Sequence, residues 1–216
     1  RDLVRSRGLG DVYKRQETQI PKVFLDTSSL VAPDELNGDL LLMESRTSVR
    51  RITCHLLEQG RTLPGFIGDI SYAQSNRERY EGFCQALADA GKKVDSSLCL
   101  TTPLGIDTYR EEIDTFLSSL SRMPDAFVCA SDYVACILMQ LLEKRGLRVP
   151  EDVAVSGFDN NTEDLLAEHL TTVQVFNEEL GARLALQILY RIKYPNTPHE
   201  ITYLGTNVLY RDSTGD

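Results

Sequence analysis

Polar side chains that could bind a ligand stand directly after several predicted strands. They are Asp26, Asp69, Ser131, Asp132, Asp159 and Asn160. The carboxyl ends of parallel strands meet at one edge of an α/β sheet, where the strand fixes a residue and the loop exposes it. Any one of these residues alone is explained as well by a helix N-cap. Their number favours a site that binds the hydroxyl groups of a small molecule.

Neighbouring residues indicate which of these side chains cap a helix and which could contact a ligand. Asp132 directly precedes a predicted helix, so we expect it to cap that helix and to leave Ser131 facing a ligand. Asp159 is followed by three other capping candidates, which frees its carboxylate. Arg79 lies near the start of a predicted helix, where its charge opposes the helix dipole. A partner outside the helix would explain Arg79, and a solvated surface arginine is the alternative.

No arrangement of residues predicts catalysis. The three histidines, His55, His169 and His199, lie near no nucleophile motif, and GxSxG, HExxH and a Walker lysine after a glycine-rich loop do not occur. Carboxylates could pair for acid/base work, but Asp and Arg at strand ends bind hydroxyl groups more simply, through charge-assisted hydrogen bonds. We therefore predict a binding protein that is not an enzyme and uses no cofactor.

The cysteines indicate a structural role. Cys54, Cys84, Cys99, Cys129 and Cys136 form an odd set without CxxC spacing, and most have apolar neighbours. A small buried thiol fits such positions. This usage favours a reducing, cytoplasmic setting over metal binding or redox work, so no metal site is expected.

Composition excludes two classes of partner for this segment. A chain of 216 residues that is 42% hydrophobic can bury a core, and its net charge of −9 repels phosphate backbones. The longest apolar run, 133–142, is broken by Gln140, so we expect no membrane span. The N-terminal segment also lacks the apolar core of a signal peptide.

From Ile20 onward, short apolar runs alternate with helical periodicity, which is typical of α/β folds with parallel sheets covered on both faces. Extended segments are predicted at 22–25, 39–43, 63–67, 94–100, 126–130, 153–158 and 170–175, with a last strand through Val208. Helices are predicted around 49–57, 80–87, 108–120, 134–142, 162–169 and 178–192, with Gly60, Gly91 and Gly146 closing three of them.

Residues 1–19 are expected to lie outside this fold as a foreign-looking or disordered prefix. Residues 1–16 carry five arginines or lysines and almost no apolar periodicity, so they cannot form an amphipathic element. The Gly8-Leu9-Gly10 sequence is no phosphate loop, because no strand precedes it and no helix follows it.

Three stretches together resemble the effector-binding domain of the LacI/GalR family of bacterial regulators. They are PDAFVCASD at 124–132, GLRVPEDVAVSGFD at 146–159 and LTTV at 170–173. The family pattern there is a strand ending in Asn-Asp, a helix, a Val-Pro-Glu-Asp turn, a strand ending in Gly-Phe-Asp, and Leu-Thr-Thr-Val. Further matching segments are LLEQG at 56–60, FIG at 66–68, RYEGF at 79–83, Gly181 and LYRDS at 209–213. The resemblance runs from about Ile20 to Ser213.

The resemblance implies a two-lobed fold like that of type I periplasmic binding proteins, with parallel sheets flanked by helices and three crossovers between the lobes. Residues 44–174 and 199–216 would form the C-terminal lobe. Residues 20–43 and 175–198 would form a remnant of the N-terminal lobe, whose opening strands are absent, as is the helix-turn-helix head.

Carried over by position, the resemblance implies a pocket formed by Asp26 and Met43 from the first lobe, Arg79, Ser131 and Asp159 from the second lobe, and Asn177 near a crossover. Asp159 would accept hydrogen bonds from hydroxyl groups, and Arg79 would donate to ring or hydroxyl oxygens. Ser131 replaces the usual Asn, and Met43 and Asn177 replace positions that are often aromatic, which weakens sugar stacking.

The implied function is to sense a small-molecule effector, such as a sugar, for a cytoplasmic regulator. Cleft closure would change how a homodimer holds two DNA-binding heads, so operator DNA would be bound only through the missing helix-turn-helix. We expect the dimer face at 133–143 and 162–170, with Cys136 and Met139 adding apolar surface; the alternative is that both segments only cover the sheet. The competing functions are a periplasmic sugar-binding protein of a transporter and a small enzyme on the same fold.

Overall fold

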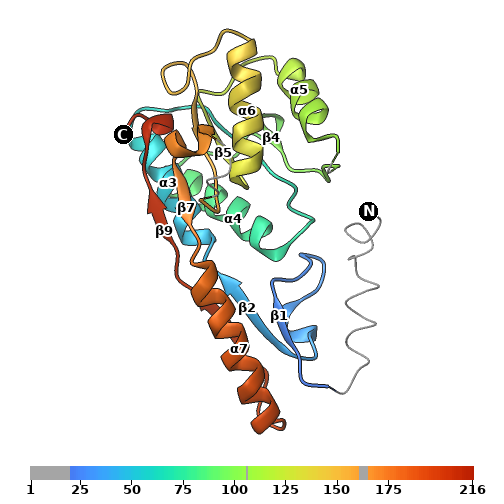
Figure 1. The fold of residues 1–216 in the computed structure, drawn as a ribbon. Helices are drawn as coiled ribbons and strands as arrows, with labels where there is room; N and C mark the ends of the chain where they lie inside the picture. The colour runs from blue at the N-terminus through green and yellow to red at the C-terminus, as the bar shows by residue number, and fades with distance from the viewer. Residues whose placement is uncertain (1–19, 106, 161–164) are drawn as a thin grey trace.

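The structure, a computed structural model, describes residues 20–105, 107–160 and 165–216. It has a larger part that carries α3, α4, α5 and α6, and a narrower part that carries β1, β2 and α7 (Figure 1). This is the α/β arrangement predicted from the sequence, with parallel sheets flanked by helices. The prefix predicted at 1–19 lies outside the described residues.

The narrower part, called here the first-lobe part, is built on a three-stranded parallel sheet in the order β1-β2-β8. Its elements are β1 (Val23–Leu25), the 3-10 helix η1 (Pro33–Glu35), β2 (Asp39–Met43), α7 (Asn177–Lys193) and β8 (Ile201–Leu204). The central strand β2 is buried along almost its whole length. Helix α7 contacts β1 and extends beyond the sheet (Figure 1).

The larger part, called the second lobe, holds a four-stranded parallel sheet in the order β4-β3-β5-β6. Its strands are β3 (Pro64–Ile67), β4 (Cys99–Leu100), β5 (Ala126–Cys129) and β6 (Ala154–Ser156). Its helices are α3 (Arg46–Glu58), α4 (Gln74–Asp89), η2 (Ser96–Leu98), α5 (Tyr109–Ser119), α6 (Asp132–Lys144), η3 (Leu165–His169) and η4 (Asp212–Thr214). An antiparallel pair, β7 (Thr172–Gln174) and β9 (Asn207–Leu209), completes it.

The chain crosses between the two parts three times, as expected. The crossings lie at 44–45 between β2 and α3, at 175–176 between β7 and α7, and at 205–206 between β8 and β9. The third crossing corrects an expected boundary. Residues 199–216 were assigned together to the C-terminal lobe, but β8 pairs with β2, from Leu40 beside Ile201 to Met43 beside Leu204, and only the chain after β8 returns.

Glycines end three helices where the sequence predicted them. Gly60, Gly91 and Gly146 have φ values of +89°, +69° and +72°, the left-handed conformation in which a side chain is unfavourable. Gly82 serves a different purpose, because a Cβ there would lie 2.2 Å from the carbonyl oxygen of Arg46. Its missing side chain lets α4 pack closely against α3.

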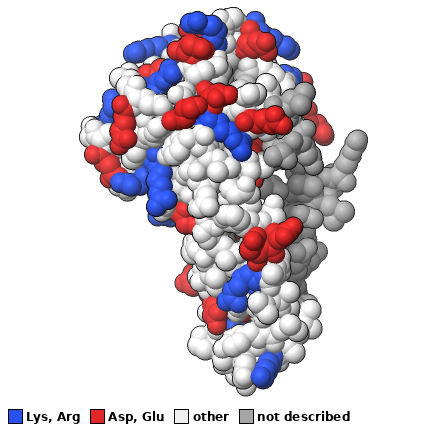
Figure 2. All heavy atoms as spheres, turned by 60° about the vertical axis from the view of Figure 1, so that its left-hand side comes forward, with Lys and Arg blue, Asp and Glu red and all other residues white. Residues whose placement is uncertain are grey.

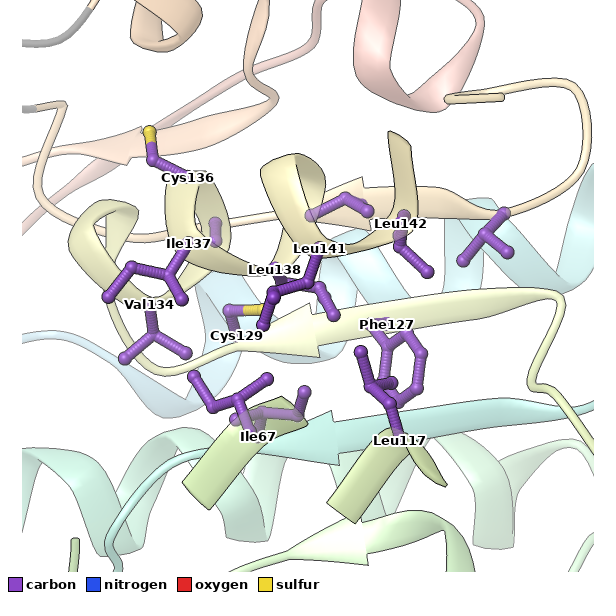
Figure 3. Close-up of a cluster of buried hydrophobic side chains, with 14 of the residues drawn as sticks. Ile67, Leu117, Phe127, Cys129, Val134, Cys136, Ile137, Leu138, Leu141 and Leu142 are labelled. Atoms are coloured by element: carbon purple, nitrogen blue, oxygen red, sulfur yellow. The ribbon is translucent and has the colours of Figure 1, made fainter. Parts of the chain in front are cut away.

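One apolar cluster joins α6 to the sheet of the second lobe. Leu138, Leu141 and Leu142 of α6 lie over Phe127 and neighbouring strand residues (Figure 3). The other members labelled there are Ile67, Leu117, Cys129, Val134, Cys136 and Ile137. The helix has the apolar periodicity of a buried face, and dense packing of this kind is the main source of stability in such a lobe.

Two sequence expectations in the second lobe are wrong in detail. Residues 94–100 were predicted to be one strand, but residues 96–98 form the 3-10 helix η2 and only Cys99–Leu100 pairs. Cys136 was expected to add apolar surface to a dimer face, but it is 5% exposed and belongs to the core. It points away from β5 and is covered on that side as well (Figure 3).

The end of the chain differs from the sequence expectation too. The single last strand predicted through Val208 is two strands, β8 and β9, which lie in different sheets. Residues 162–164 of the helix predicted at 162–169 lie outside the described residues, and Leu165–His169 form a 3-10 helix. Among the described residues, no helix has the length and apolar content needed to cross a bilayer.

Candidate functional site

Arg79 of α4 is the centre of a cluster that joins both parts of the molecule. Its guanidinium Nη2 lies 3.6 Å from the Met43 sulfur, at the end of β2, and 3.5 Å from Oδ1 of Asp159, after β6. Its Nη1 donates a short hydrogen bond to the carbonyl of Ala130, after β5. The guanidinium also lies over the Phe158 ring, 3.7 Å from its centre. Arg79 therefore has the partners outside its helix that the sequence analysis invoked.

The Arg79 side chain has almost no contact with solvent. The residue is 5% exposed, and its Nε has no hydrogen-bond partner among the described residues. Burial lowers the pKa of the guanidinium, while the carboxylates of Asp159, Asp26, Asp132 and Glu78 oppose that effect. A buried cation with an unused donor is costly, and a polar group that accepts from it would be stabilised.

Asp159 is the solvent-exposed member of its ion pair with Arg79. Its side chain is 44% exposed, whereas that of Arg79 is 6% exposed. Burial raises the pKa of the Asp159 carboxyl, and the positive charge of Arg79 opposes the rise. The residue has φ of +107°, and its amide donates to the Val173 carbonyl at 3.0 Å. A backbone conformation rarely adopted by side-chain-bearing residues thus fixes this carboxylate above the guanidinium.

Asp26 lies at the same junction but has internal partners. It follows β1 with φ of +58°, and its carboxylate accepts from the Thr27 amide at 2.7 Å. It also accepts from the Ser75 amide at 3.3 Å and the Ser75 hydroxyl at 2.5 Å. Ser75 is in the first turn of α4, so this first-lobe carboxylate occupies the positive end of a second-lobe helix.

Ser131 and Asp132 have the opposite roles from those expected. Ser131 is the N-cap of α6, and its hydroxyl accepts from the Val134 amide at 3.3 Å. Asp132 is the first residue of the helix, since the Ala135 amide donates to the Ser131 carbonyl at 3.0 Å, and the Asp132 amide donates to the Phe158 carbonyl at 2.8 Å. Its buried carboxylate accepts from the Thr172 hydroxyl at 2.6 Å. The expectation that Asp132 caps the helix is therefore wrong.

The structure gathers five of the six predicted site residues near Arg79. Asp26, Met43 and Asp159 surround it, and Ser131 follows Ala130, whose carbonyl accepts from it. Asn177 is exposed at the first residue of α7, and no contact described in the structure joins it to the others.

Two contributors to the site were not predicted. Phe158 lies beneath Arg79, and Ser75 engages Asp26. Phe158 could have been found from its place in the Gly-Phe-Asp motif, but nothing in the sequence marks Ser75.

Near the same end of the sheet, the Tyr109 and Tyr133 rings pack edge to face at 5.7 Å, and Tyr133 is largely exposed. Among described side chains, no group of three His, Cys, Asp or Glu is placed to hold a metal ion.

Comparisons with known proteins agree with this architecture. Residues 53–214 match a periplasmic binding protein-like domain. The HTH-type transcriptional regulator DegA of Bacillus subtilis (strain 168) is 35% identical over 166 residues, which are 76% of this chain and 47% of DegA. The chain spans about half the length of the curated relatives it matches.

Solved structures share the fold. The complex of the transcriptional regulator CelR with cellobiose superposes with a TM-score of 0.78 at 26% identity, covering 88% of this chain and 58% of that one. A LacI family regulator of Enterococcus faecium with bound ribose gives a TM-score of 0.73 at 22% identity, covering 98% of this chain and 76% of that one. The second likeness shows a shared fold only.

Proposed function

The chain belongs to the periplasmic binding protein-like family, as an effector-binding domain of the LacI/GalR type, and from this we propose that it senses a small molecule for a DNA-binding transcriptional regulator. The observation that carries the proposal is the Asp159–Arg79 pair. A half-exposed carboxylate is fixed over a buried guanidinium where the two parts of the molecule meet. Such a pair can accept from and donate to adjacent hydroxyl groups of one ligand.

We propose a sugar or a related polyhydroxylated metabolite as the effector. Asp159 accepts from its hydroxyl groups, and the unused Arg79 Nε is the donor that such a ligand satisfies when the two parts adjust around it. Cellobiose in the CelR complex supports this class of ligand. The exposed Tyr133 ring offers an aromatic face that Met43 and Asn177 do not supply.

Binding alone accounts for this site, so we propose no chemical step. The residues around Arg79 hold and orient a ligand, and the curated relatives are regulators. The same relatives favour a cytoplasmic regulator over a transporter's sugar-binding protein. An effector that binds one arrangement of the two lobes more tightly than another shifts the protein toward that arrangement. This shift would carry the signal to a DNA-binding head outside this chain.

We also propose that the functional unit is a homodimer, as sedimentation equilibrium can test. Tyr133 and Met139 on α6 are accessible to a second copy, whereas the buried Cys136 is not. A purely monomeric species across the micromolar range would contradict this assembly for the chain tested.

Calorimetric titration with cellobiose and with ribose tests the site. We expect Asp159→Ala to weaken binding of the accepted sugar at least tenfold with the fold retained, because it removes a polar anchor and no core volume. The unfolding midpoint should fall, since Arg79 loses a counter-charge. Asp114→Ala is the matched control, since Asp114 is also half-exposed and paired with an arginine, 2.8 Å from Arg145, but lies on α5. Equal affinity of the Asp159 variant and the unmodified chain would remove Asp159 from the site, and no heat with either sugar or other pentoses and hexoses would overturn the sugar assignment.

A further inference from the structure

Helix α4 belongs to the second lobe, yet part of what holds it comes from the first-lobe part. It packs along α3 and over the sheet through Phe83 and Leu87. Its N-terminal half, which carries Arg79, donates hydrogen bonds to one first-lobe segment and accepts a hydrogen bond from another. These are the loop after β1 and the strand β8.

The first contact holds the beginning of the helix. The Gln74 amide donates to the Thr27 carbonyl at 2.8 Å, and both the amide and the hydroxyl of Ser75 donate to Asp26. Ser29 adds a hydrogen bond from its hydroxyl to the Ser71 carbonyl at 3.1 Å. The N-cap residue of α4, Ala73, has no side chain able to accept these amides, so the other part of the molecule does so.

The second contact holds the next turn. The Tyr203 hydroxyl on β8 donates to Oε1 of Glu78 at 2.7 Å, and the Gln74 side chain donates to the same oxygen at 3.1 Å. Glu78 is buried, so its carboxylate depends on these donors. Burial and the neighbouring Glu78 charge raise the pKa of Tyr203, which keeps the hydroxyl protonated as a donor. Glu78 directly precedes Arg79 in the helix.

Helix α6 shows that this dependence is particular to α4. Both helices follow strands of the same sheet, but α6 takes its cap from its own preceding residue, Ser131, and its first amide bonds to Phe158 of the same lobe. Separation of the two parts would leave the α6 cap intact. It would leave the first amides of α4 without their acceptors and the Glu78 carboxylate without the Tyr203 hydroxyl.

We propose that Tyr203 and Ser75 form an interlobe clasp that holds α4 without any effector and makes both residues positioning residues for Arg79. The clasp joins three segments far apart in sequence, 26–29, 74–78 and 203, and its bonds can be lost only together with movement of α4 relative to the first-lobe part. Arg79 moves with that helix. The clasp does not depend on the nature of the effector, so a failure of the proposed sugar binding would leave it in place.

Hydrogen exchange of the chain without added ligand tests the clasp. We expect Tyr203→Phe, which removes only the hydroxyl, to speed exchange of the Gln74 and Ser75 amides on the order of tenfold, the loss of a hydrogen bond to a charged group. Ser75→Ala should have a similar effect on these amides. The Val134 amide in α6 should not change. Tyr190→Phe is the matched control, because Tyr190 is a part-exposed first-lobe tyrosine on α7.

A spectroscopic readout separates positioning from general stability. The Nε proton resonance of Arg79 should shift in Tyr203→Phe and Ser75→Ala but not in Tyr190→Phe, and Glu78→Gln, which keeps an acceptor oxygen, should retain most of the amide protection. Unchanged α4 exchange in Tyr203→Phe would overturn the clasp. If exchange in α6 rises as well, the variant has loosened the whole lobe, and Ser75→Ala, which keeps Tyr203, then decides between the two outcomes.

Discussion

The central strands of the two sheets are buried by different neighbours. In the second lobe, β5 places Phe127 and Cys129 in one apolar cluster, and Ala126 and Val128 in another on the opposite face. Alternate residues of a strand point to opposite faces, so this sheet is covered by apolar side chains on both sides. Its stability rests on packing spread over many residues.

In the first-lobe part, an apolar cluster covers one face of β2, while the other face combines the buried Leu41 with a buried charge. Leu40 and Leu42 pack with Val31 and Leu36, whereas Asp39 on the other face forms an ion pair with Arg191 of α7. Both charged side chains are almost fully buried. The carboxylate also accepts from Gln187 at 2.8 Å and from the Glu200 amide at 2.9 Å, and Arg191 donates to the 197–198 backbone.

The outer surfaces of the two parts also differ in the charged and apolar side chains that they expose. Charged side chains are spread over the larger part of the molecule and are sparse on the narrower part (Figure 2). Helix α7 buries a stripe that contains Gln187 and Arg191 and exposes apolar side chains, among them Leu186, Leu189 and Ile192. A helix that buries polar groups and exposes apolar ones gains little from burial, so the first-lobe part depends on keeping this buried polar network fully paired.

Breaking that network should have the largest effect. Arg191→Ala leaves the Asp39 carboxylate buried without its countercharge, and we expect a loss of about 3–5 kcal/mol. Amide exchange should rise in peptides from β2, β8 and α7 while β3, β5 and α6 keep their protection, because the loss is local to the first-lobe part.

Arg148→Ala is the control, because it also removes an arginine from an ion pair with an aspartate, but at an exposed position. Arg148 pairs with Asp152 at 3.0 Å on the second-lobe surface, where its side chain is 69% exposed, so its removal should cost far less stability than that of Arg191. Equal losses for the two arginine variants would mean that the buried network is not what holds the first-lobe part.

Leucine-to-alanine substitutions compare how much apolar packing contributes to stability in the two parts. Leu138 of α6 is fully buried, and Leu138→Ala should cost about 2–5 kcal/mol in chemical denaturation through the cavity it leaves. Leu189 of α7 is 61% exposed, and Leu189→Ala should stay within about 0.5 kcal/mol. A large loss for Leu189→Ala would show that something covers α7 in solution.

Features that depend on a few neighbouring residues were predicted correctly from the sequence. Residues 39–43 form the predicted strand, and Gly60, Gly91 and Gly146 end helices as expected. Left-handed glycines and apolar runs act within a few residues, so these features can be inferred without knowing the tertiary structure.

The failures arose where distant residues decide. The sequence could not show that Ser131 and not Asp132 caps α6, because the Asp132 carboxylate is held by Thr172, 40 residues further along the chain. The pairing of Asp39 with Arg191 spans 152 residues. For the same reason the site was only partly predictable: the family motif indicated Arg79 and Asp159, but Ser75 meets Asp26 only through the arrangement of the two parts.

Lowering the pH should weaken the two parts unequally, with a smaller effect than Arg191→Ala. Burial alone would raise the pKa of Asp39, but hydrogen bonds from Arg191, Gln187 and the Glu200 amide bring it below its ordinary value. Stabilisation from a lowered carboxyl pKa is fully present above the unfolded-state value of about 4 and is lost as the pH falls through the folded-state value.

Amide exchange of β2 and β8 peptides between pH 6 and pH 2.5, corrected for the intrinsic pH dependence of exchange, measures this loss. Protection there should fall more steeply than in β5 peptides, and Asp39→Asn, which cannot titrate, should remove the difference between the two sheets. The effect is smaller than that of Arg191→Ala because a protonated Asp39 still accepts hydrogen bonds and Arg191 keeps its bonds to the 197–198 carbonyls. Parallel loss of protection in both sheets would show that Asp39 does not set the acid sensitivity of the first-lobe part.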